Sequence, residues 1–506
     1  MPEPAARPAA FFPAGPLVVF GLYLIVMLVQ AALLATSGRS DDLETLLLAQ
    51  SLEWGYQAKN PPGFYWLAHA VMAMTGPSLP VIYALRLAGV FAMVAGLYAL
   101  ARRLQPDPLL AACAGFGVLA TLHFHWYLLF YLTNTTLALA LAAPLFIAAL
   151  RLRETPTLAA YALLGLVVGL GVLARYNFVL LVAGLFAAAL TLPEWRRLVL
   201  RRRMLAAVAV AAALIAPHVV WVADNSALLA GDAQAQLVGD ASYPARVAEG
   251  FGGLVEATAS ILALPFGLLA LVCFPQAFRR CRPADPGRAS ALALLGRTIA
   301  IALGLVAVAA LAGLAYVRPH HLFFLVLAPV WLIARLDRPG LRRWAAPGFA
   351  TAVAGLSALA VLAFPFETRR DAAGCDACEE FQPIELYAQA IRAAGFTPGT
   401  IVALSRRQDF PTAALLAAFP DARMVAPDFP VYAPPPNPAP GDCLIVWSGA
   451  EERPADWPQG APVPGLGLPA PPDAAIGQVT GRLALSGRAT PGMRYLLVKG
   501  GLGDCR

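Results

Sequence analysis

Charge is scarce in this sequence, and lysine is almost absent. Of the 506 residues, 13% are charged and 59% are hydrophobic, and the mean hydropathy is +0.66, which together exclude an ordinary soluble protein. Lys59 and Lys499 are the only lysines, so arginine carries nearly all of the positive charge. The net charge of +7 does not indicate nucleic-acid binding, because the cations lie in short clusters between apolar runs. No nucleic-acid partner is expected.

The start of the chain also lacks a cleavage-site pattern, which favours a retained first helix over a removed signal peptide. Apolar runs near 20 residues recur, which is the length that crosses a bilayer. These runs predict a polytopic, mainly α-helical membrane protein with about eleven spans. The expected spans are Leu17–Thr36, Pro80–Ala101, Pro108–Leu122, Thr135–Leu150, Leu158–Ala174, Phe178–Leu192, Met204–Val222, Leu254–Phe274, Thr298–Val317, Leu322–Ala334 and Ala345–Phe364.

One set of the predicted loops contains very few cations. With a cytoplasmic N-terminus, arginine clusters fall in the inner loops, whereas the outer segments between spans hold only Arg39, Lys59, Arg175, Arg246 and Arg318. Because translocating positive residues is disfavoured, this asymmetry predicts the orientation. Residues 37–78 then form a long outer loop, and the chain beyond Phe364 is also outside.

The tail has a different character from the rest of the chain. Residues 365–506 are rich in Pro and Gly and alternate helical with strand-like patterns, which predicts a small α/β domain outside the membrane, beside a membrane domain of residues 1–364. Four of the seven cysteines lie there, and an oxidising compartment favours disulfides, among them Cys375–Cys378. Half of a zinc site is the alternative for that pair, but no second CxxC or paired histidines accompany it.

Carboxylates are concentrated at the start of the long outer loop. Asp41, Asp42 and Glu44 lie within four residues, and Lys59 follows before a Pro-Pro corner. A helix beginning near Asp41 would have a wide apolar flank and could lie along a membrane surface with its acidic end at the water boundary. The alternative is an amphipathic loop helix whose charges are simply solvated.

Cations also appear at the outer membrane face, where orientation does not explain them. Arg86 lies inside the second span, while Arg175-Tyr176 and Arg318-Pro319-His320-His321 lie at outer turns. Extension of the side chain to lipid headgroups explains any one cation alone. Together with Lys59 and the nearby acids, however, they suit a lipid-anchored phosphate whose reacting atom lies near a general base. For the two histidines, interfacial packing is favoured over metal binding, since no third ligand has suitable spacing.

The region 41–67 resembles the first periplasmic loop of bacterial glycosyltransferase family 39, the dolichyl-phosphate-mannose-protein mannosyltransferase-like family. The matching residues are Asp41-Asp42, Ala49-Gln50, Trp54-Gly55-Tyr56 and Lys59-Asn60-Pro61-Pro62, followed in order by Arg86-Leu87, Arg175-Tyr176, Pro217-His218 with Trp221, and Arg318-Pro319-His320-His321.

This resemblance implies a GT-C fold in the bacterial inner membrane, with the active site and the C-terminal α/β domain in the periplasm. It implies transfer of a sugar from a polyprenyl-phosphate carrier to a glycolipid acceptor, with inversion at the anomeric carbon. The residues of the loop are most similar to those of lipid A and core galacturonosyltransferases. The implied catalytic residues are Asp41, as the base, and Asp42. The implied phosphate contacts are Lys59, Arg86, Arg175, Arg318 and His320, and the further substrate contacts are Glu44, Tyr56, Asn60, Tyr176 and His321.

One position departs from the family pattern. Many members have Thr-Asp where this chain has Thr133-Asn134, and asparagine can neither act as a base nor anchor a cation strongly. No cofactor or protein metal site is therefore predicted, although a divalent cation stays open. A protein mannosyltransferase-like enzyme, a transporter of lipid-linked sugars and a scaffold are the alternatives. The transporter is disfavoured because the candidate charges gather at one face and the halves show no repeat.

Overall fold

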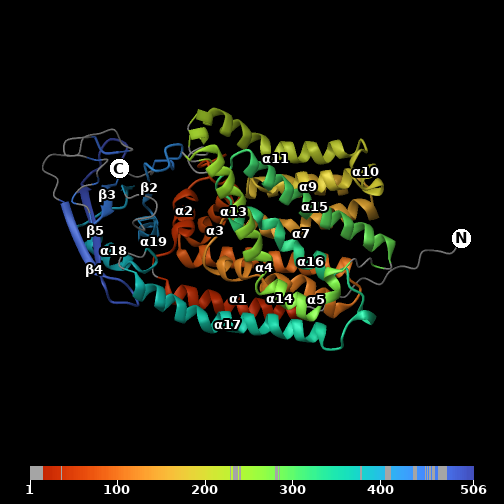
Figure 1. Cartoon of the computed structure of the whole chain (residues 1–506). Coiled ribbons are helices and arrows are strands. Elements are labelled where there is room, and N and C mark those ends of the chain that lie inside the picture. The colour runs from red at the N-terminus through yellow and green to blue at the C-terminus, as the bar shows by residue number, and fades with distance from the viewer. Residues whose placement is uncertain are drawn as a thin grey trace.

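The computed structural model describes residues 15–35, 37–227, 229–231, 241–279, 285–375, 379–404, 412–436, 441–450 and 476–506, with positions 238, 283, 452, 454, 457 and 462–464. Figure 1 shows an elongated helical body with a small sheet domain at one end. The helices of the body are α1 (Gly15–Leu34), α2 (Ser40–Leu48), α3 (Gly63–Thr75), α4 (Leu79–Leu104), α5 (Pro108–Phe116), α6 (Leu128–Phe130), α7 (Thr135–Glu154), α8 (Leu158–Ala174), α9 (Phe178–Leu190), α10 (Pro193–Val199), α11 (Met204–Asp224), α13 (Tyr243–Leu262), α14 (Phe266–Cys273), α15 (Pro286–Leu311), α16 (Ala328–Ile333) and α17 (Ala345–Gly374).

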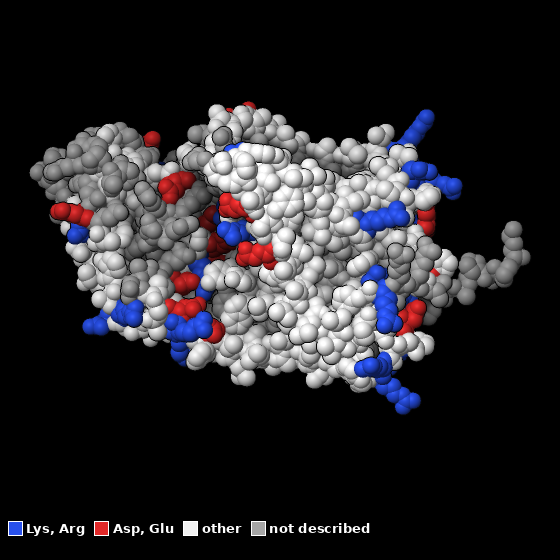
Figure 2. Space-filling view, viewed as in Figure 1, with Lys and Arg blue, Asp and Glu red and all other residues white. Residues whose placement is uncertain are grey.

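Six of the described helices are long and apolar enough to cross a membrane, or seven if the bent pair α9–α10 forms one span. They are α1, α4, α7, α11, α15 and α17, and three shorter apolar helices accompany them: residues 108–120, α8 and residues 319–333. Figure 2 shows Lys and Arg gathered at the end of the body farthest from the sheet. Helices α4 and α7 each carry two arginines in their last turn, and arginine clusters of this kind fit a multi-pass membrane protein.

Three expected spans are not single α-helices. The expected span Leu254–Phe274 is divided between α13 and α14, because Pro265 has no N–H to continue the helical ladder. The expected span Leu322–Ala334 begins as a 3₁₀ segment, η4 (Pro319–Leu327), before α16. The expected span Pro108–Leu122 is α5 followed by a 3₁₀ turn, η1 (Gly117–Ala120). The predicted domain boundary at residue 364 falls inside α17, which continues to Gly374.

Close helix packing depends on small residues in α8. A Cβ atom on Gly165 would lie 2.2 Å from the backbone oxygen of Ala207 in α11, so only glycine permits this approach. Figure 1 shows α1 and α17 side by side along one edge of the body, where Gln30 Nε2 donates to the Val361 carbonyl at 3.1 Å. Close packing at Gly165 therefore fixes α8 against α11, and Arg175 follows the last residue of α8.

The C-terminal domain is a five-stranded mixed sheet with strand order β2-β1-β3-β5-β4. Its elements are η6 (Glu379–Phe381), α18 (Ile384–Ala393), β1 (Thr400–Ala403), η7 (Thr412–Ala414), α19 (Leu415–Ala418), β2 (Arg423–Val425), β3 (Cys443–Ser448), β4 (Ile476–Arg482) and β5 (Ala489–Val498). Strand β1 runs parallel to β2 and β3, and β5 runs antiparallel to β3 and β4. Trp447 is buried at the centre of the sheet. The expected small α/β domain is thus confirmed, and it lies against α2 (Figure 1).

The described cysteines differ between the C-terminal domain and the helical body. Cys443 and Cys505 form a disulfide with a Cα–Cα distance of 5.1 Å. Cys375 is also disulfide-bonded, whereas Cys378, its predicted partner, lies outside the described residues. Cys113 and Cys273 are free and buried within the helical body. An interior position keeps these two thiols away from water, as expected for structural cysteines.

Candidate active site

Helix α2 carries the three clustered carboxylates, and it is enclosed rather than solvated. Its residues from Asp42 to Leu48 are all buried, with Leu46 and Leu48 fully so. The helix packs against α3 and α4 on one side and against η7 of the C-terminal domain on the other. The alternative of solvated charges is therefore wrong for Asp42 and Glu44, whereas the position of this helix at a membrane surface stays a prediction. Its acids in the first turn face the positive end of the helix dipole.

Asp42 is fully committed to neighbours within the protein. Its side chain is 1% exposed and pairs with Arg86, whose Nη1 lies 2.8 Å from Oδ1 and 3.1 Å from Oδ2. The Thr133 hydroxyl donates to the same Oδ1 at 2.7 Å. A buried carboxylate is tolerated when it is paired and hydrogen-bonded in this way. Asp42 and Arg86 thus neutralise each other behind the cavity described below, and the structure does not direct Arg86 toward it.

Glu44 is the centre of a second hydrogen-bond network. Its Oε1 accepts from Gln57 Nε2 and from the Tyr65 hydroxyl, both at 2.7 Å. The side-chain amides of Asn60 and Asn134 approach the same oxygen at 3.3 and 3.2 Å. Asn134, the departure from the family pattern, therefore serves here as a hydrogen-bond donor. This network fixes Glu44 and leaves its other oxygen, Oε2, toward Lys59 at 3.7 Å.

Asp41 is the most open of the three acids. Its side chain is 25% exposed, and Oδ1 lies 3.6 Å from Lys59 Nζ. Burial raises the pKa of the Asp41 carboxyl, and the nearby positive charges of Lys59 and Arg175 oppose that rise. Lys59, which is 39% exposed, is held between Asp41 and Glu44. Asp41 is thus a carboxylate with one ion-pair partner and access to open space.

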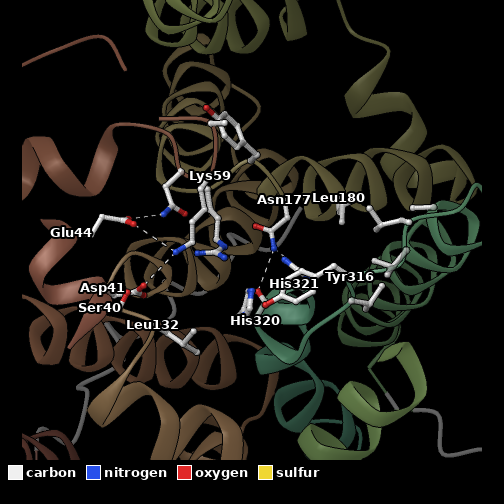
Figure 3. Close-up of a pocket in the computed structure, with 18 residues that line it drawn as sticks. Ser40, Asp41, Glu44, Lys59, Leu132, Asn177, Leu180, Tyr316, His320 and His321 are labelled. Carbon is white, nitrogen blue, oxygen red and sulfur yellow. Dashed lines mark hydrogen bonds and ion pairs between the residues drawn. The ribbon is translucent and has the colours of Figure 1, made fainter. Parts of the chain in front are cut away.

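A cavity of about 660 Å³ opens beside Asp41. Its lining includes eight of the candidate residues, which are Asp41, Glu44, Lys59, Asn60, Arg175, Tyr176, His320 and His321. In Figure 3, Asp41, Glu44 and Lys59 lie on one side, and His320, His321 and Asn177 lie on the other. Apolar side chains from α9, α15 and the turn after α15 complete the wall: Leu180, Val306, Ala309, Leu314 and Val317. One space therefore joins acids, cations and an apolar wall.

The histidine side of the cavity is held by backbone contacts. Asn177 Nδ2 donates to the carbonyls of His320 and His321 at 3.3 and 3.1 Å. His321 Nδ1 accepts the Arg318 backbone N–H at 3.1 Å. The rings of His320 and His321 meet edge to face, with centroids 4.3 Å apart. Asn177 thus ties the turn between α8 and α9 to the start of η4.

Arginine 175 reaches the cavity from the end of α8. Its Nη1 donates to the Thr135 hydroxyl at 2.8 Å, which leaves the rest of the guanidinium free to face the cavity that it lines. The neighbouring Tyr176 hydroxyl is hydrogen-bonded to His218 Nε2 at 3.0 Å, and His218 Nδ1 contacts the Trp54 carbonyl at 2.6 Å. Arg175 and Tyr176 are therefore both held by hydrogen bonds to residues that do not line the cavity.

Four candidate residues do not line the cavity. Asp42 and Arg86 face each other, as described above. Tyr56 is fully buried, and its hydroxyl donates to the Ser51 carbonyl at 2.7 Å, so it shapes the loop instead. The Arg318 guanidinium lies over the Tyr316 ring, 5.0 Å from its centroid. None of the four lines the cavity, and their expected roles as catalytic, substrate-binding or phosphate-binding groups stay predictions.

Several lining or supporting residues escaped the sequence interpretation. Gln57, Tyr65, Thr135, Asn177 and Tyr316 all support or line the site. Their side chains are neutral amides and hydroxyls, which do not stand out in an apolar sequence as charged residues do. Only their position next to a candidate, as with Asn177 after Arg175-Tyr176, gave a signal.

In the part of the chain that the structure describes, no group of three or more His, Cys, Asp or Glu side chains could hold a metal ion. Asp41 and Glu44 instead share one ammonium group, Lys59 Nζ. The acids at this site thus have a cationic partner from the protein itself.

Comparison with known proteins places this site in a family. Residues 59–221 match the family described as dolichyl-phosphate-mannose-protein mannosyltransferase. The lipopolysaccharide core galacturonosyltransferase RgtA of Rhizobium johnstonii is 30% identical over 447 residues, which cover 84% of this chain and 85% of that protein. The lipopolysaccharide core galacturonosyltransferase RgtB of the same organism is 28% identical over 330 residues, covering 64% and 66%.

A solved structure shares the fold across nearly the whole chain. The crystal structure of ArnT from Cupriavidus metallidurans bound to undecaprenyl phosphate aligns with a TM-score of 0.58 at 13% identity, covering 96% of this chain and 98% of ArnT. This likeness establishes the GT-C architecture, and the RgtA match establishes the relationship in sequence. The chain therefore belongs to the dolichyl-phosphate-mannose-protein mannosyltransferase-like family of GT-C membrane glycosyltransferases.

Proposed function

We propose that this glycosyltransferase moves a sugar from a polyprenyl-phosphate carrier to a lipid A or lipopolysaccharide core acceptor, on the periplasmic side of the bacterial inner membrane. The observation that carries the proposal is the cavity beside α2. It combines a half-open carboxylate, Asp41, with Lys59 and Arg175 and with an apolar wall. A lipid phosphate has the matching parts, which are an anion and a hydrocarbon chain.

The relatives support both substrates. ArnT was crystallised with undecaprenyl phosphate, a polyprenyl phosphate. RgtA and RgtB are named for the lipopolysaccharide core and for galacturonosyl transfer. Galacturonic acid is accordingly the first sugar to test, and a core-bearing lipid A is the first acceptor.

The chemistry follows from the charges on the acid side of the cavity. Asp41, as general base, takes the proton from the acceptor hydroxyl while that oxygen forms a bond to the anomeric carbon. The bond from that carbon to the phosphate oxygen breaks on the opposite face, which inverts the configuration. Lys59 and Arg175 stabilise the negative charge that develops on the departing lipid phosphate. Asp42 has no part in proton transfer, since Arg86 and Thr133 occupy its oxygens.

A reconstitution assay tests this proposal. Purified protein in lipid nanodiscs receives polyprenyl-phosphate galacturonic acid and core-bearing lipid A, and mass spectrometry detects the glycosylated lipid. Parallel reactions with a serine- and threonine-rich peptide test the protein mannosyltransferase-like alternative. A separate proteoliposome assay measures transbilayer movement of the donor. Movement of the donor without transfer to any acceptor would contradict the enzyme mechanism and favour the transporter.

A further inference from the structure

Both ends of α2 are fastened to the C-terminal domain. At the N-terminal end, Arg39 Nε lies 2.9 Å from Glu380 Oε1, and both side chains are largely buried. The Ser37 N–H donates to the Glu380 carbonyl at 3.2 Å, and the Gln382 N–H donates to the Ser37 hydroxyl at 3.0 Å. These contacts join the segment before α2 to the first residues of the domain.

Arg39 connects this junction directly to the start of the helix. Its carbonyl accepts the N–H groups of Asp42 and Leu43, both at 2.9 Å, so it defines where α2 begins. Its guanidinium also lies over the Tyr131 ring, 4.0 Å from the centroid. Glu380 thus contacts a side chain that links the start of α2 to the helical body.

The C-terminal end of α2 is held by Gln50. Its Oε1 accepts the Met424 N–H at 2.7 Å, and its Nε2 donates to the Met424 carbonyl at 3.0 Å. The same Nε2 donates to the Leu47 carbonyl in the last turn of α2 at 2.7 Å. Because β2 is an edge strand, Gln50 occupies backbone groups that a further strand would otherwise pair.

We propose that the C-terminal domain positions Asp41 by gripping α2 at both ends, with Glu380, Arg39 and Gln50 as positioning residues for transfer. This inference rests on the proposed function in so far as Asp41 is the base. The Asp42–Arg86 pair and the hydrogen bonds of Glu44 already hold the middle of α2. The contacts with the C-terminal domain add support at both ends of the helix, which fixes its rotation and its height in the cavity. A displacement near 1 Å at a reacting group can cost on the order of 100-fold in rate, so loss of these contacts should slow transfer.

Two substitutions break the grip without touching the cavity. Glu380→Gln removes the ion pair at one end, and Gln50→Leu removes the hydrogen bonds at the other. The matched control is Glu385→Gln, because Glu385 pairs with Arg392 at 3.0 Å on the exposed face of α18, in the same domain but away from α2. We expect each test variant to lower turnover by about 10- to 100-fold with the donor KM changed by less than about threefold, and the control to match wild type.

Hydrogen exchange separates this inference from the proposed function. In full-length protein, the amides of α2 should exchange severalfold faster in Glu380→Gln and Gln50→Leu than in wild type or Glu385→Gln. This readout needs no substrate, so it decides the grip even if the wild type transfers no galacturonic acid. Unchanged α2 exchange in both variants, or the same increase in Glu385→Gln, would overturn the inference.

The wild-type protein provides a further test should the variants fail to accumulate. With increasing urea, α2 should lose protection together with the β2 amides of the C-terminal domain. If α2 stayed protected after the sheet had unfolded, the domain would not hold it, and the inference would be wrong.

Discussion

Replacing Asp41 by asparagine removes the proposed base with almost no change in shape. General-base catalysis contributes about 10²- to 10⁴-fold, equivalent to roughly 3 to 5 kcal/mol of barrier, so we expect turnover to fall by that factor. Stability should hardly change, because the Asp41–Lys59 pair is partly exposed and such pairs contribute about 0 to 1 kcal/mol. Donor affinity should also persist, since Lys59 and Arg175 stay in place.

The raised pKa of Asp41 predicts in which direction stability and turnover change with pH. Burial raises the pKa of Asp41, so the folded protein holds that proton more tightly than the unfolded chain does. The contribution of the Asp41 carboxyl to the free energy of unfolding is therefore fully present below its pKa in the unfolded chain. It is lost as the pH rises through its pKa in the folded protein. Turnover runs the other way, because only the ionised carboxylate accepts a proton, so activity should rise across the raised pKa. Asp41→Asn should abolish that limb of the profile.

The assay combines turnover, a pH profile and thermal unfolding of purified wild type and Asp41→Asn in nanodiscs. Glu385→Gln serves as a control for an unrelated charge loss. If Asp41→Asn kept near-wild-type turnover, the assignment of the base would be wrong. Glu44, the other acid that lines the cavity, would then be tested, ahead of the buried Asp42.

Three further predictions follow from the same contacts. Lys59→Ala should weaken donor binding and slow transfer, with partial rescue by Lys59→Arg, as measured by turnover across donor concentrations; unchanged kinetics would leave Lys59 as an interfacial cation. Arg86→Ala should lower the free energy of unfolding by about 3 to 5 kcal/mol, because it leaves Asp42 buried without its cation, and a wild-type melting curve would contradict this. Cys375 and Cys378 should resist thiol labelling in intact cells until a reductant is added, and strong labelling without reductant would refute their oxidation.

The two adjacent aspartates show where sequence reasoning reached its limit. Both were candidates for catalysis because the family resemblance implies catalytic acids at the start of this loop. Successive residues on a helix point about 100° apart, so Asp41 faces the cavity while Asp42 faces Arg86. The sequence contains this angle but not the direction of the cavity. Only the position of α4 decides which acid is open.

The fold was predicted well where a long apolar run was the only signal. It was predicted poorly where a proline interrupted such a run. Long apolar runs predicted α1, α4, α7, α11, α15 and α17, because length and hydrophobicity suffice for a span. The same hydrophobicity hid the break before Pro265, since an apolar run through a proline still scores as a span. Strand β4 carries no strong signal, because its side chains alternate between exposed and partly exposed, with glycines at 477 and 481, and it therefore lacks an apolar face.

The hydrogen bonds between Gln50 and Met424 join residues 374 positions apart. A ribosome makes α2 early and β2 late, and the chain inserts and folds largely in that order. The spans can therefore enter the bilayer well before Gln50 meets its partner. During synthesis there is thus an interval in which the helical body is already made but α2 is not yet bound to the C-terminal domain. Under the proposed function, activity should begin only after the last strands have joined the sheet, so a chain interrupted before Met424 would insert into the membrane and remain inactive.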